Sequence, residues 1–430
     1  MAKKVVIISG KDPREGHGGS SNYLRLHARA ALRGGYEPHI FCIAPEAKVV
    51  ETDYGVLHLL RARWRPFGPF ILPHRTRNER FILNWFNASI FSPRSVPIHN
   101  QRMVDGISEF LRAEPDLEIL HSFFTWSYVA GKIKERLGGQ GRKVTSINSV
   151  YTTIGHEMRA MTKGISFRTD PVKRLFYEME WEWVRRVVSR CERDGYLAAD
   201  LVLANYESVR KLFFAEHGPH PDFRLIAYAA EPAFRDEALP DTPPPEIASF
   251  SETGGPLIVS VSRHDPRKGV DVLLRALAEV KSAGISFRAI LVGFGPLLAR
   301  HRELARGLGL DDVVRITGMV DDSFPYLRQA EIYVLPSLQE GSGSVALLEA
   351  LQAGAAVVAS DVDGIPEDLT DEVNGLLVEP GQVKQLASAL TRVIRDCDLR
   401  RRLSLAARRT YEVRFTAERL TAALSEIYGE

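Results

Sequence analysis

The stretch from Glu331 to Gly354 constrains the fold more than any other part of the sequence. Its first six residues are rich in β-branched and aromatic side chains, which is typical of a short buried strand. A polar loop follows and contains Gly341 and Gly343, which tolerate positive φ and let a ligand approach the backbone. Ser344 can N-cap the next helix and Gly354 can end it. A strand, a glycine loop and a helix N-terminus in this order predict an anion site.

Two glutamates bracket this anion site, Glu340 in the loop and Glu349 in the helix. An ionised carboxylate only accepts hydrogen bonds, so it is suited to hydroxyl groups and unsuited to phosphate. The combination predicts a ligand that carries both an anion and hydroxyls, such as a sugar phosphate or a nucleotide sugar.

Composition sets the broad class of the protein. A length of 430 residues suggests two or three domains, and 45% hydrophobic with 26% charged residues is ordinary for a soluble globular protein. A formal charge of +2 gives no support for a general nucleic-acid role. Cys42, Cys191 and Cys397 lie far apart without metal-ligand spacing, which fits a reducing compartment. No apolar run approaches the length of a membrane span. We expect a cytoplasmic location, with peripheral contact at the inner face of the membrane left open.

The N-terminal half reads as an open α/β sheet. Lys4–Ser9 is an almost continuous run of valine and isoleucine, the pattern of a parallel strand covered on both faces. A loop with Gly18 and Gly19, a helix over Asn22–Arg33 and a strand over Pro38–Ala44 follow, which favours a doubly wound sheet. The loop lacks the full GxGxxG pattern, so a bound dinucleotide is weakly supported. Further strands are predicted at 117–121, 143–148, 200–204 and 224–227.

The β/α rhythm begins again after a proline-rich and glycine-rich linker. Strands are predicted at 257–262, 287–292, 313–316, 331–336, 355–359 and 376–378, with helices at 270–283, 297–308 and 345–352. We therefore predict an α/β protein of two doubly wound, Rossmann-like domains that face a central cleft. The predicted parts are residues 1–239, a linker at 240–255, residues 256–410, and a terminal helix within 411–430 that packs back towards the N-terminal domain.

Two segments of the N-terminal half break this pattern. Arg61–Arg102 holds eight arginines, one acidic residue and seven aromatic residues. It is either an irregular surface insertion packed on its domain or an acceptor groove or membrane-facing lip for an anionic or lipid-linked substrate. Asp170 and Pro171 then open a long helix with apolar residues at helical spacing, which we expect to face the core. These residues are Val172, Leu175, Phe176, Met179, Trp183, Val187 and Cys191.

Two cations complete the predicted anion site. Arg263 and Lys268 fall on the loop between a predicted strand and helix, and ligands bind at such loops in open α/β sheets. Arginine offers a fork to phosphate oxygens and lysine a point charge. The alternative is a pair of solvated surface cations. The second anion site in the same domain favours phosphate binding.

These segments together resemble glycosyltransferase family 4, the retaining nucleotide-sugar enzymes of GT-B fold. The C-terminal half carries the resemblance through SRHDPRKGVDVLLRA, LVGFGP, VLPSLQEGSGSVALLEALQAGAAVVASDVDGIPE and NGLLVEPG. The N-terminal half matches more loosely, through the glycine loop, Leu120-His121 and Ala199-Asp200. The resemblance implies that the first domain binds the acceptor and the second the nucleotide-sugar donor.

The resemblance also implies roles for individual residues. Arg263 and Lys268 would hold the donor diphosphate, and Glu349 would hold the ribose hydroxyls. Glu340 would face the donor sugar, and Met319–Val320 would line the base. Backbone amides near the helix start would hold the β-phosphate and the sugar, with Gly341, Gly343, Ser344 and Val345 as the candidates. No metal or other cofactor is implied.

In the N-terminal half the resemblance implies that Gly18 and Gly19 contact the donor. His121 is a candidate catalytic residue, or it is a structural histidine with partners inside the fold. Family members often have a histidine where this chain has Phe123, and another where it has Asn148. His121 or Asn148 could supply the missing polar contact beside the donor sugar.

The sequence departs from the family pattern in its second half as well. Eight residues separate Glu340 and Glu349, where the family usually has seven. Phe294 stands where the family often has aspartate. Asp361-Val362-Asp363 superficially resembles a metal-binding DxD motif, but it follows a strand and precedes the family's glycine loop, so we interpret it as a loop.

The predicted function is a retaining, metal-independent glycosyltransferase that moves a hexose from a nucleotide-diphosphate sugar to an acceptor hydroxyl, in glycan, glycolipid or small-molecule biosynthesis. One alternative is a non-catalytic or regulatory nucleotide-sugar-binding protein of the same fold. Another is a synthase acting on a small sugar phosphate. The sequence leaves the base, the sugar, the acceptor and the oligomeric state open.

Overall fold

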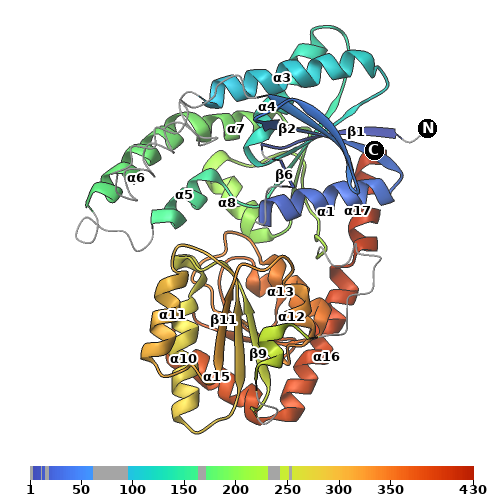
Figure 1. The fold of residues 1–430 in the computed structure, drawn as a ribbon. Coiled ribbons are helices and arrows are strands. Elements are labelled where there is room, and N and C mark those ends of the chain that lie inside the picture. The colour runs from blue at the N-terminus through green and yellow to red at the C-terminus, as the bar shows by residue number, and fades with distance from the viewer. Residues whose placement is uncertain are drawn as a thin grey trace. The chain divides into compact units, whose positions relative to one another are not determined.

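The computed structural model describes residues 3–10, 12–14, 19–61, 95–162, 171–230, 243–250 and 254–430. The chain forms two compact units (Figure 1). The first unit contains Met1–Ile226 and Leu420–Glu430, and the second contains Ala227–Arg419. Among the helices of the described ranges, none combines the length and the apolar character needed to cross a bilayer.

The first unit is built on an eight-stranded sheet of order β3-β4-β2-β1-β5-β6-β7-β8. Its strands are β1 (Lys3–Ile8), β2 (Tyr36–Ala44), β3 (Lys48–Thr52), β4 (Gly55–Arg61), β5 (Ile119–Phe123), β6 (Thr145–Val150), β7 (Leu201–Ala204) and β8 (Phe223–Leu225). All neighbours are parallel except the β3–β4 hairpin. The strand order reverses between β1 and β5, and the carboxyl ends of the strands at such a switch point form a crevice where open sheets bind ligands.

Helices cover this sheet because its central strands are apolar on both faces. They are α1 (Gly19–Arg33), α3 (Ser95–Ala113), α4 (Ser127–Gly138), α5 (Ile154–Thr162), α6 (Pro171–Trp183), α7 (Ser189–Ala198) and α8 (Glu207–His217), with α17 (Ala417–Gly429) joining from the end of the chain. Val5–Ile8 of β1 are fully buried, and residues of β1 and β5 share one core cluster with α3 and α4. The predicted strand over Lys4–Ser9 is therefore confirmed.

The Arg61–Arg102 segment differs from its prediction where it is described. Residues 62–94 lie outside the described part, and with them most of the proposed acceptor groove. Residues 95–102 begin α3, a regular helix, so the expectation of an irregular insertion is wrong for this end. The β3–β4 hairpin just before the segment was not predicted either, because two short strands with alternating polar residues give a weak pattern.

The long helix predicted from Pro171 onwards is interrupted. A π-helical turn, Val184–Val188, separates α6 from α7. Val184 and Val188 are buried, whereas Leu175 and Met179 are 56% and 59% exposed. The prediction that the whole apolar stripe faces the core is therefore wrong for Leu175 and Met179. A π turn has a wider repeat than an α-helix, so the face of α6 is out of register with the face of the turn.

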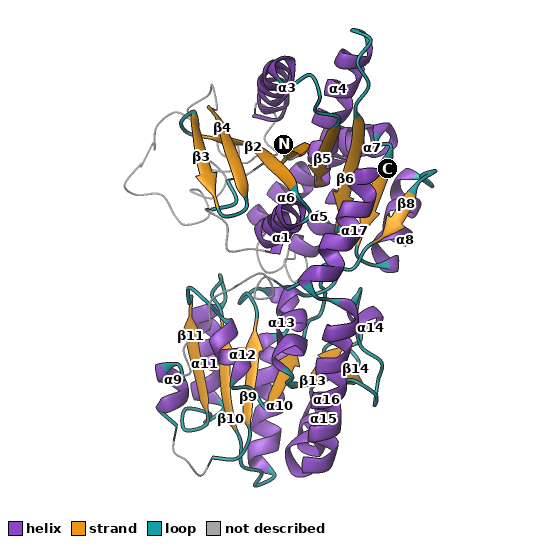
Figure 2. Cartoon of the chain, turned by 90° about the vertical axis from the view of Figure 1, so that its right-hand side faces the viewer, coloured by secondary structure: helices purple, strands orange, loops and turns teal. Residues whose placement is uncertain are grey.

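The second unit has six parallel strands in the order β11-β10-β9-β12-β13-β14. They are β9 (Leu257–Val261), β10 (Arg288–Val292), β11 (Val314–Gly318), β12 (Ile332–Leu335), β13 (Ala356–Ser360) and β14 (Leu376–Val378). The helices are α9 (Pro245–Ala248), α10 (Val270–Ser282), α11 (Leu298–Gly307), α12 (Phe324–Arg328), α13 (Val345–Ala353), α14 (Ile365–Asp368), α15 (Val383–Arg395) and α16 (Cys397–Arg414). They lie on both faces of the sheet (Figure 2). Two Rossmann-like units with parallel sheets confirm the predicted fold class.

Candidate functional site

Three loops of the second unit meet at one edge of its sheet. They follow β9, β12 and β13, which are neighbours in the sheet. Parallel strands place their carboxyl ends on the same side, and the strand order reverses between β9 and β12. The loops carry Arg263 to Lys268, Ser337 to Ser344 and Asp361 to Asp363. Six of the residues predicted to bind the donor lie on them, namely Arg263, Lys268, Glu340, Gly341, Gly343 and Ser344.

Lys268 and Glu340 form a buried ion pair at this edge. The Lys268 Nζ lies 2.6 Å from Glu340 Oε2, and the two side chains are 17% and 3% exposed. The Ser337 hydroxyl donates to the other carboxylate oxygen of Glu340. The Leu338 amide also donates to the Arg267 carbonyl at 2.7 Å, which fastens the β12 loop to the β9 loop. The structure thus pairs the predicted phosphate ligand with the predicted sugar ligand.

Arg263 lies at the rim of the same edge. Its side chain is 59% exposed, and its Nη2 lies 3.4 Å from Oδ2 of Asp265, which is 6% exposed. Asp265 is itself held in place, because its Oδ1 accepts the Arg267 amide at 3.0 Å and caps the 3₁₀ turn Pro266–Lys268. A buried carboxylate therefore orients an exposed guanidinium whose remaining N–H donors can reach an anion.

The helix N-terminus forms as predicted. Ser344 has extended backbone angles, and its hydroxyl accepts the Leu347 amide at the start of α13. Gly354 ends the helix in the left-handed conformation, with φ of +76°. Ser344 therefore begins the nine-residue helix that carries Glu349.

Glu349 is nearly buried on α13, with 8% of its surface exposed. Tyr333 of β12 is fully buried close by. Burial raises the pKa of Tyr333 well above its usual value, and the negative charges of Glu340 and Glu349 raise it further. A neutral phenol thus lies near both glutamates.

Asp363 binds the glutamate loop through its backbone. One carboxylate oxygen accepts the amide of Glu340 at 2.6 Å and the amide of Gly341 at 2.8 Å. The Gly364 amide in turn donates to the Ser342 carbonyl at 2.9 Å. This agrees with interpreting Asp361-Val362-Asp363 as a loop. These contacts could not be predicted from the sequence, because they join segments that only the sheet brings together.

An apolar rim borders the Arg263 loop. Phe294 and Met319 are 45% and 60% exposed at the ends of β10 and β11. A Cβ on Gly293 would lie 1.9 Å from the Ser262 carbonyl oxygen, so the β10 loop packs directly on the β9 loop. Exposed aromatic and thioether side chains can pack on a flat base, which fits the predicted place of Met319 and Val320.

The predicted residues of the first unit have a different character. His121 is fully buried, with Nδ1 2.5 Å from the Tyr428 hydroxyl of α17 and Nε2 2.7 Å from the Ser149 hydroxyl. Burial, and secondly the nearby His27, lower its pKa well below the usual value. Both ring nitrogens have partners inside the unit, which favours the structural alternative over the catalytic one.

The other predicted residues of this unit are less informative. Asn148 is 1% exposed, and its side-chain oxygen is 3.4 Å from the Ser122 hydroxyl. Gly19 is the first residue of α1, and Gly18 lies outside the described residues. The helix N-terminus after β1 still suits an anion, because free amides gather there.

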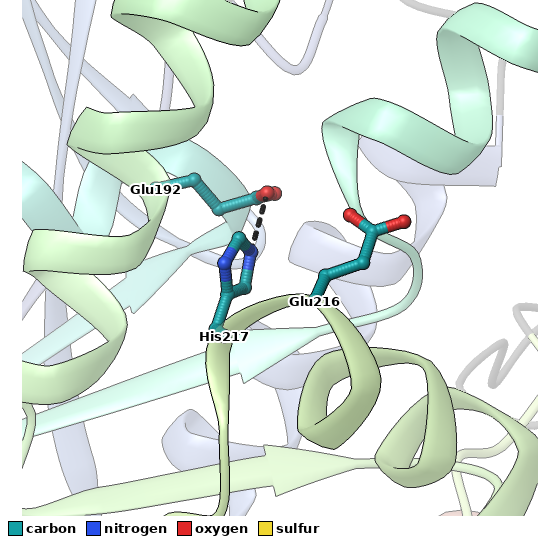
Figure 3. A group of neighbouring side chains, drawn as sticks. All are labelled: Glu192, Glu216 and His217. Atoms are coloured by element: carbon teal, nitrogen blue, oxygen red, sulfur yellow. Dashed lines mark hydrogen bonds and ion pairs between the residues drawn. The ribbon is translucent and has the colours of Figure 1, made fainter.

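A separate group of three ligand-type side chains lies in the first unit (Figure 3). The ligand atoms of Glu192, Glu216 and His217 lie within 4.8 Å of one another. Glu192 is buried and uses both oxygens, one for the Ile154 amide at 3.0 Å and one for His217 Nε2 at 2.9 Å. Arg159 lies 2.5 Å from Glu216. Glu192 and His217 therefore contact each other inside the unit, whereas Glu216 pairs with Arg159 at the surface.

Comparison with known proteins finds similarity in the second unit. Residues 255–396 match the family described as glycosyl transferases group 1. A D-inositol 3-phosphate glycosyltransferase of Saccharomonospora viridis is 38% identical over 185 residues, 40% of this chain and 42% of that protein. A GDP-mannose-dependent alpha-(1-6)-phosphatidylinositol monomannoside mannosyltransferase of Mycobacterium tuberculosis is 31% identical over 179 residues, 40% of this chain and 46% of that protein. The chain thus spans less than half the length of these relatives.

The whole chain shares its fold with solved glycosyltransferases. Sucrose-phosphate synthase from Thermosynechococcus elongatus matches with a TM-score of 0.67 at 22% identity, over 99% of this chain and 98% of that chain. Residues 255–396 are therefore similar to group 1 glycosyltransferases, and the chain has the GT-B fold.

Proposed function

We propose that this protein is a glycosyltransferase that moves a sugar from a nucleotide-diphosphate sugar to an acceptor hydroxyl. The observation that carries the proposal is the cluster of Arg263, Lys268 and the capped N-terminus of α13 at one sheet edge, beside Glu340 and Glu349. Three sources of positive potential suit a diphosphate, and two carboxylates suit hydroxyl groups. The group 1 match of this unit supports the same reaction class.

The mechanism follows from where charge develops. Cleavage of the sugar–phosphate bond places negative charge on the leaving diphosphate, which Arg263, Lys268 and the amides at Gly343 to Val345 would stabilise. Lys268 donates one of its three N–H groups to Glu340 and can donate the other two to phosphate. We propose retention of configuration, family 4 membership and independence from metal. The leaving phosphate would accept the acceptor proton, so no dedicated base is required.

We propose that the first unit binds the acceptor. The predicted lipid-linked or anionic acceptor and the peripheral membrane contact rest on the arginine-rich and aromatic-rich composition of 61–102. The two relatives are named for an inositol phosphate and for a phosphatidylinositol mannoside, which makes such acceptors the first to try. A cytoplasmic location and a hexose donor remain part of the proposal.

The test is a donor panel of UDP- and GDP-sugars scored by nucleotide release and by the anomeric configuration of the product. Arg263→Ala and Lys268→Ala should each lower transfer by about 10²-fold, as expected for groups that stabilise transition-state charge. Lys281→Ala is the matched control, since Lys281 forms an exposed ion pair with Asp312 at the far end of α10. Turnover that is unchanged in both site variants would refute the proposal.

A non-catalytic nucleotide-sugar-binding protein is the second candidate. Two observations favour it: Lys268 and Glu340 form an ion pair with each other, and the loop between Glu340 and Glu349 is one residue longer than is usual in family 4. Calorimetric binding of a nucleotide sugar without nucleotide release against any acceptor would support this candidate. Release in the presence of a small sugar phosphate alone would instead identify a synthase.

A further inference from the structure

Asp363 occupies an unusual backbone position for its residue type. Its φ is +50°, in the left-handed region that favours glycine, and the only other non-glycine residues there in the described ranges are Phe124 and Glu372. A residue is held in this region when surrounding contacts over-determine it. Here the contacts are two backbone amides, those of Glu340 and Gly341, which converge on a single carboxylate oxygen at 2.6 Å and 2.8 Å.

The two amides belong to the loop that carries the site carboxylate. Gly341 also has a left-handed backbone, with φ of +89°, so the chain turns sharply just after Glu340. Two successive amides that point the same way form a small anion-binding nest. In this protein the nest is filled by a side chain of the neighbouring β13 loop, and a charged acceptor makes the two bonds stronger than neutral ones.

The side chain of Glu340 is fixed from the opposite direction. Its carboxylate lies between Lys268 Nζ and the Ser337 hydroxyl, and it is almost fully buried. The geometry of Glu340 is therefore set twice, once at the carboxylate by Lys268 and Ser337 and once at the backbone by Asp363. Without the Asp363 contact, the loop backbone could move even though the Lys268–Glu340 ion pair still holds the Glu340 carboxylate.

We propose that Asp363 is a positioning residue of the donor site, which anchors the backbone of the loop that carries Glu340. The Asp363 carboxylate binds the backbone amides of Glu340 and Gly341. It thereby keeps Glu340 in place for the donor sugar without touching substrate itself. The catalytic part of this inference rests on the proposed glycosyltransferase function.

The test compares three substitutions at one position. Asp363→Asn keeps an acceptor oxygen, Asp363→Ala removes it, and Asp363→Gly removes it while relieving the left-handed backbone. We expect kcat to fall by about 10- to 100-fold in the alanine and glycine variants, since small misplacements of a site group have effects of this size. Calorimetric affinity for UDP or GDP should stay unchanged, and the asparagine variant should recover most of kcat.

A second readout does not depend on activity. Hydrogen exchange of peptides that span Ser337 to Ser344 should speed up in the alanine and glycine variants and stay near wild type in the asparagine variant. Glu372→Gly is the matched control, because it also removes an acidic side chain from a left-handed position, here one paired with Arg392 on the surface. It should change neither readout of the site.

The two proposals fail in different ways. If Asp363→Gly exchanges and turns over like wild type, Asp363 does not position the loop. If the wild-type protein releases no nucleotide from any donor but the exchange pattern follows the prediction, the role of Asp363 in the loop stands and the proposed activity is wrong.

Discussion

The Lys268–Glu340 pair makes a quantitative prediction about stability. Replacing Lys268 by methionine keeps most of its volume and leaves the Glu340 carboxylate, 3% exposed, without its cation. Removal of one partner of a buried ion pair costs about 3–5 kcal/mol, and the 17% exposure of Lys268 places the expected loss near the lower limit, about 3 kcal/mol. Glu340→Gln should cost about 1.5 kcal/mol, because Lys268 can still reach water.

The double variant separates the coupling free energy of the Lys268–Glu340 pair from the effects of the two single substitutions. With both charges gone, no unpaired buried charge remains, so Lys268→Met/Glu340→Gln should be about as stable as Glu340→Gln alone. The coupling between the two sites is then about 3 kcal/mol. Lys281→Met is the control, since its ion pair with Asp312 joins side chains that are 35% and 65% exposed and should contribute less than about 1 kcal/mol.

The assay is urea unfolding followed by far-UV circular dichroism and by tryptophan fluorescence. The sequence has five tryptophans, and the three that lie in the described ranges, Trp126, Trp181 and Trp183, belong to the first unit. The urea midpoint of the fluorescence transition, which reports on the first unit, should stay constant in the variants. The urea midpoint of the dichroism transition of the second unit should change. A Lys268→Met variant within about 0.5 kcal/mol of wild type, or a double variant as unstable as both single losses together, would refute the buried-pair reasoning.

Three further predictions concern other single residues. Gly269→Ala should destabilise the second unit by about 3 kcal/mol or more in urea unfolding, because φ is +59° and a Cβ would lie 2.0 Å from a β12-loop carbonyl oxygen. Gly284 is also left-handed but has open space around it, so Gly284→Ala should cost only about 1 kcal/mol. Equal losses in the two variants would contradict the steric argument. Tyr428→Phe should cost about 1–3 kcal/mol in tryptophan-monitored unfolding, because it leaves a buried nitrogen of His121 without its partner, and an unchanged midpoint would show that water replaces the hydroxyl. Burial lowers the pKa of His27 to about 4, so between pH 6.5 and 4 the unfolded state binds a proton at this residue that the folded state does not. His27 alone should therefore lower the free energy of unfolding by up to about 3 kcal/mol as pH drops through this window, in addition to the losses from His58 and His121, whose pKa values burial also lowers. His27→Gln should make the slope shallower by this share, and an unchanged slope would contradict the prediction.

The local elements were predictable because their signals are local. Strands that are apolar on both faces, such as β1 and β13, can only be central parallel strands. Ser344 and Gly354 mark the ends of α13 through their own hydroxyl and backbone freedom, and the structure has both caps. The β/α alternation then leaves few topologies, so two Rossmann-like units followed from the order of elements.

The contacts between side chains that are distant in the sequence were not predictable in the same way. Lys268 and Glu340 are 72 residues apart, and His121 and Tyr428 are 307 apart, so no periodicity links them. The sequence marked Lys268 and Glu340 as ligands for two parts of a donor, and the sheet order of β9 and β12 made them partners of each other. His121 was predicted to be either a catalytic or a structural residue, and the Tyr428 hydroxyl of α17 beside its ring favours the structural alternative.

The sequence alone determined the strand–loop–helix unit at Glu331–Gly354, its two carboxylates and the cations upstream. The tertiary structure decided which groups neutralise which, because parallel strands gather loops that are distant in the chain at one edge of a sheet. Asp363 shows the difference most clearly. Its residue type suggested a metal-binding motif or an ordinary loop, and only the neighbouring loop after β12, with two amides facing its carboxylate, gave it a specific role.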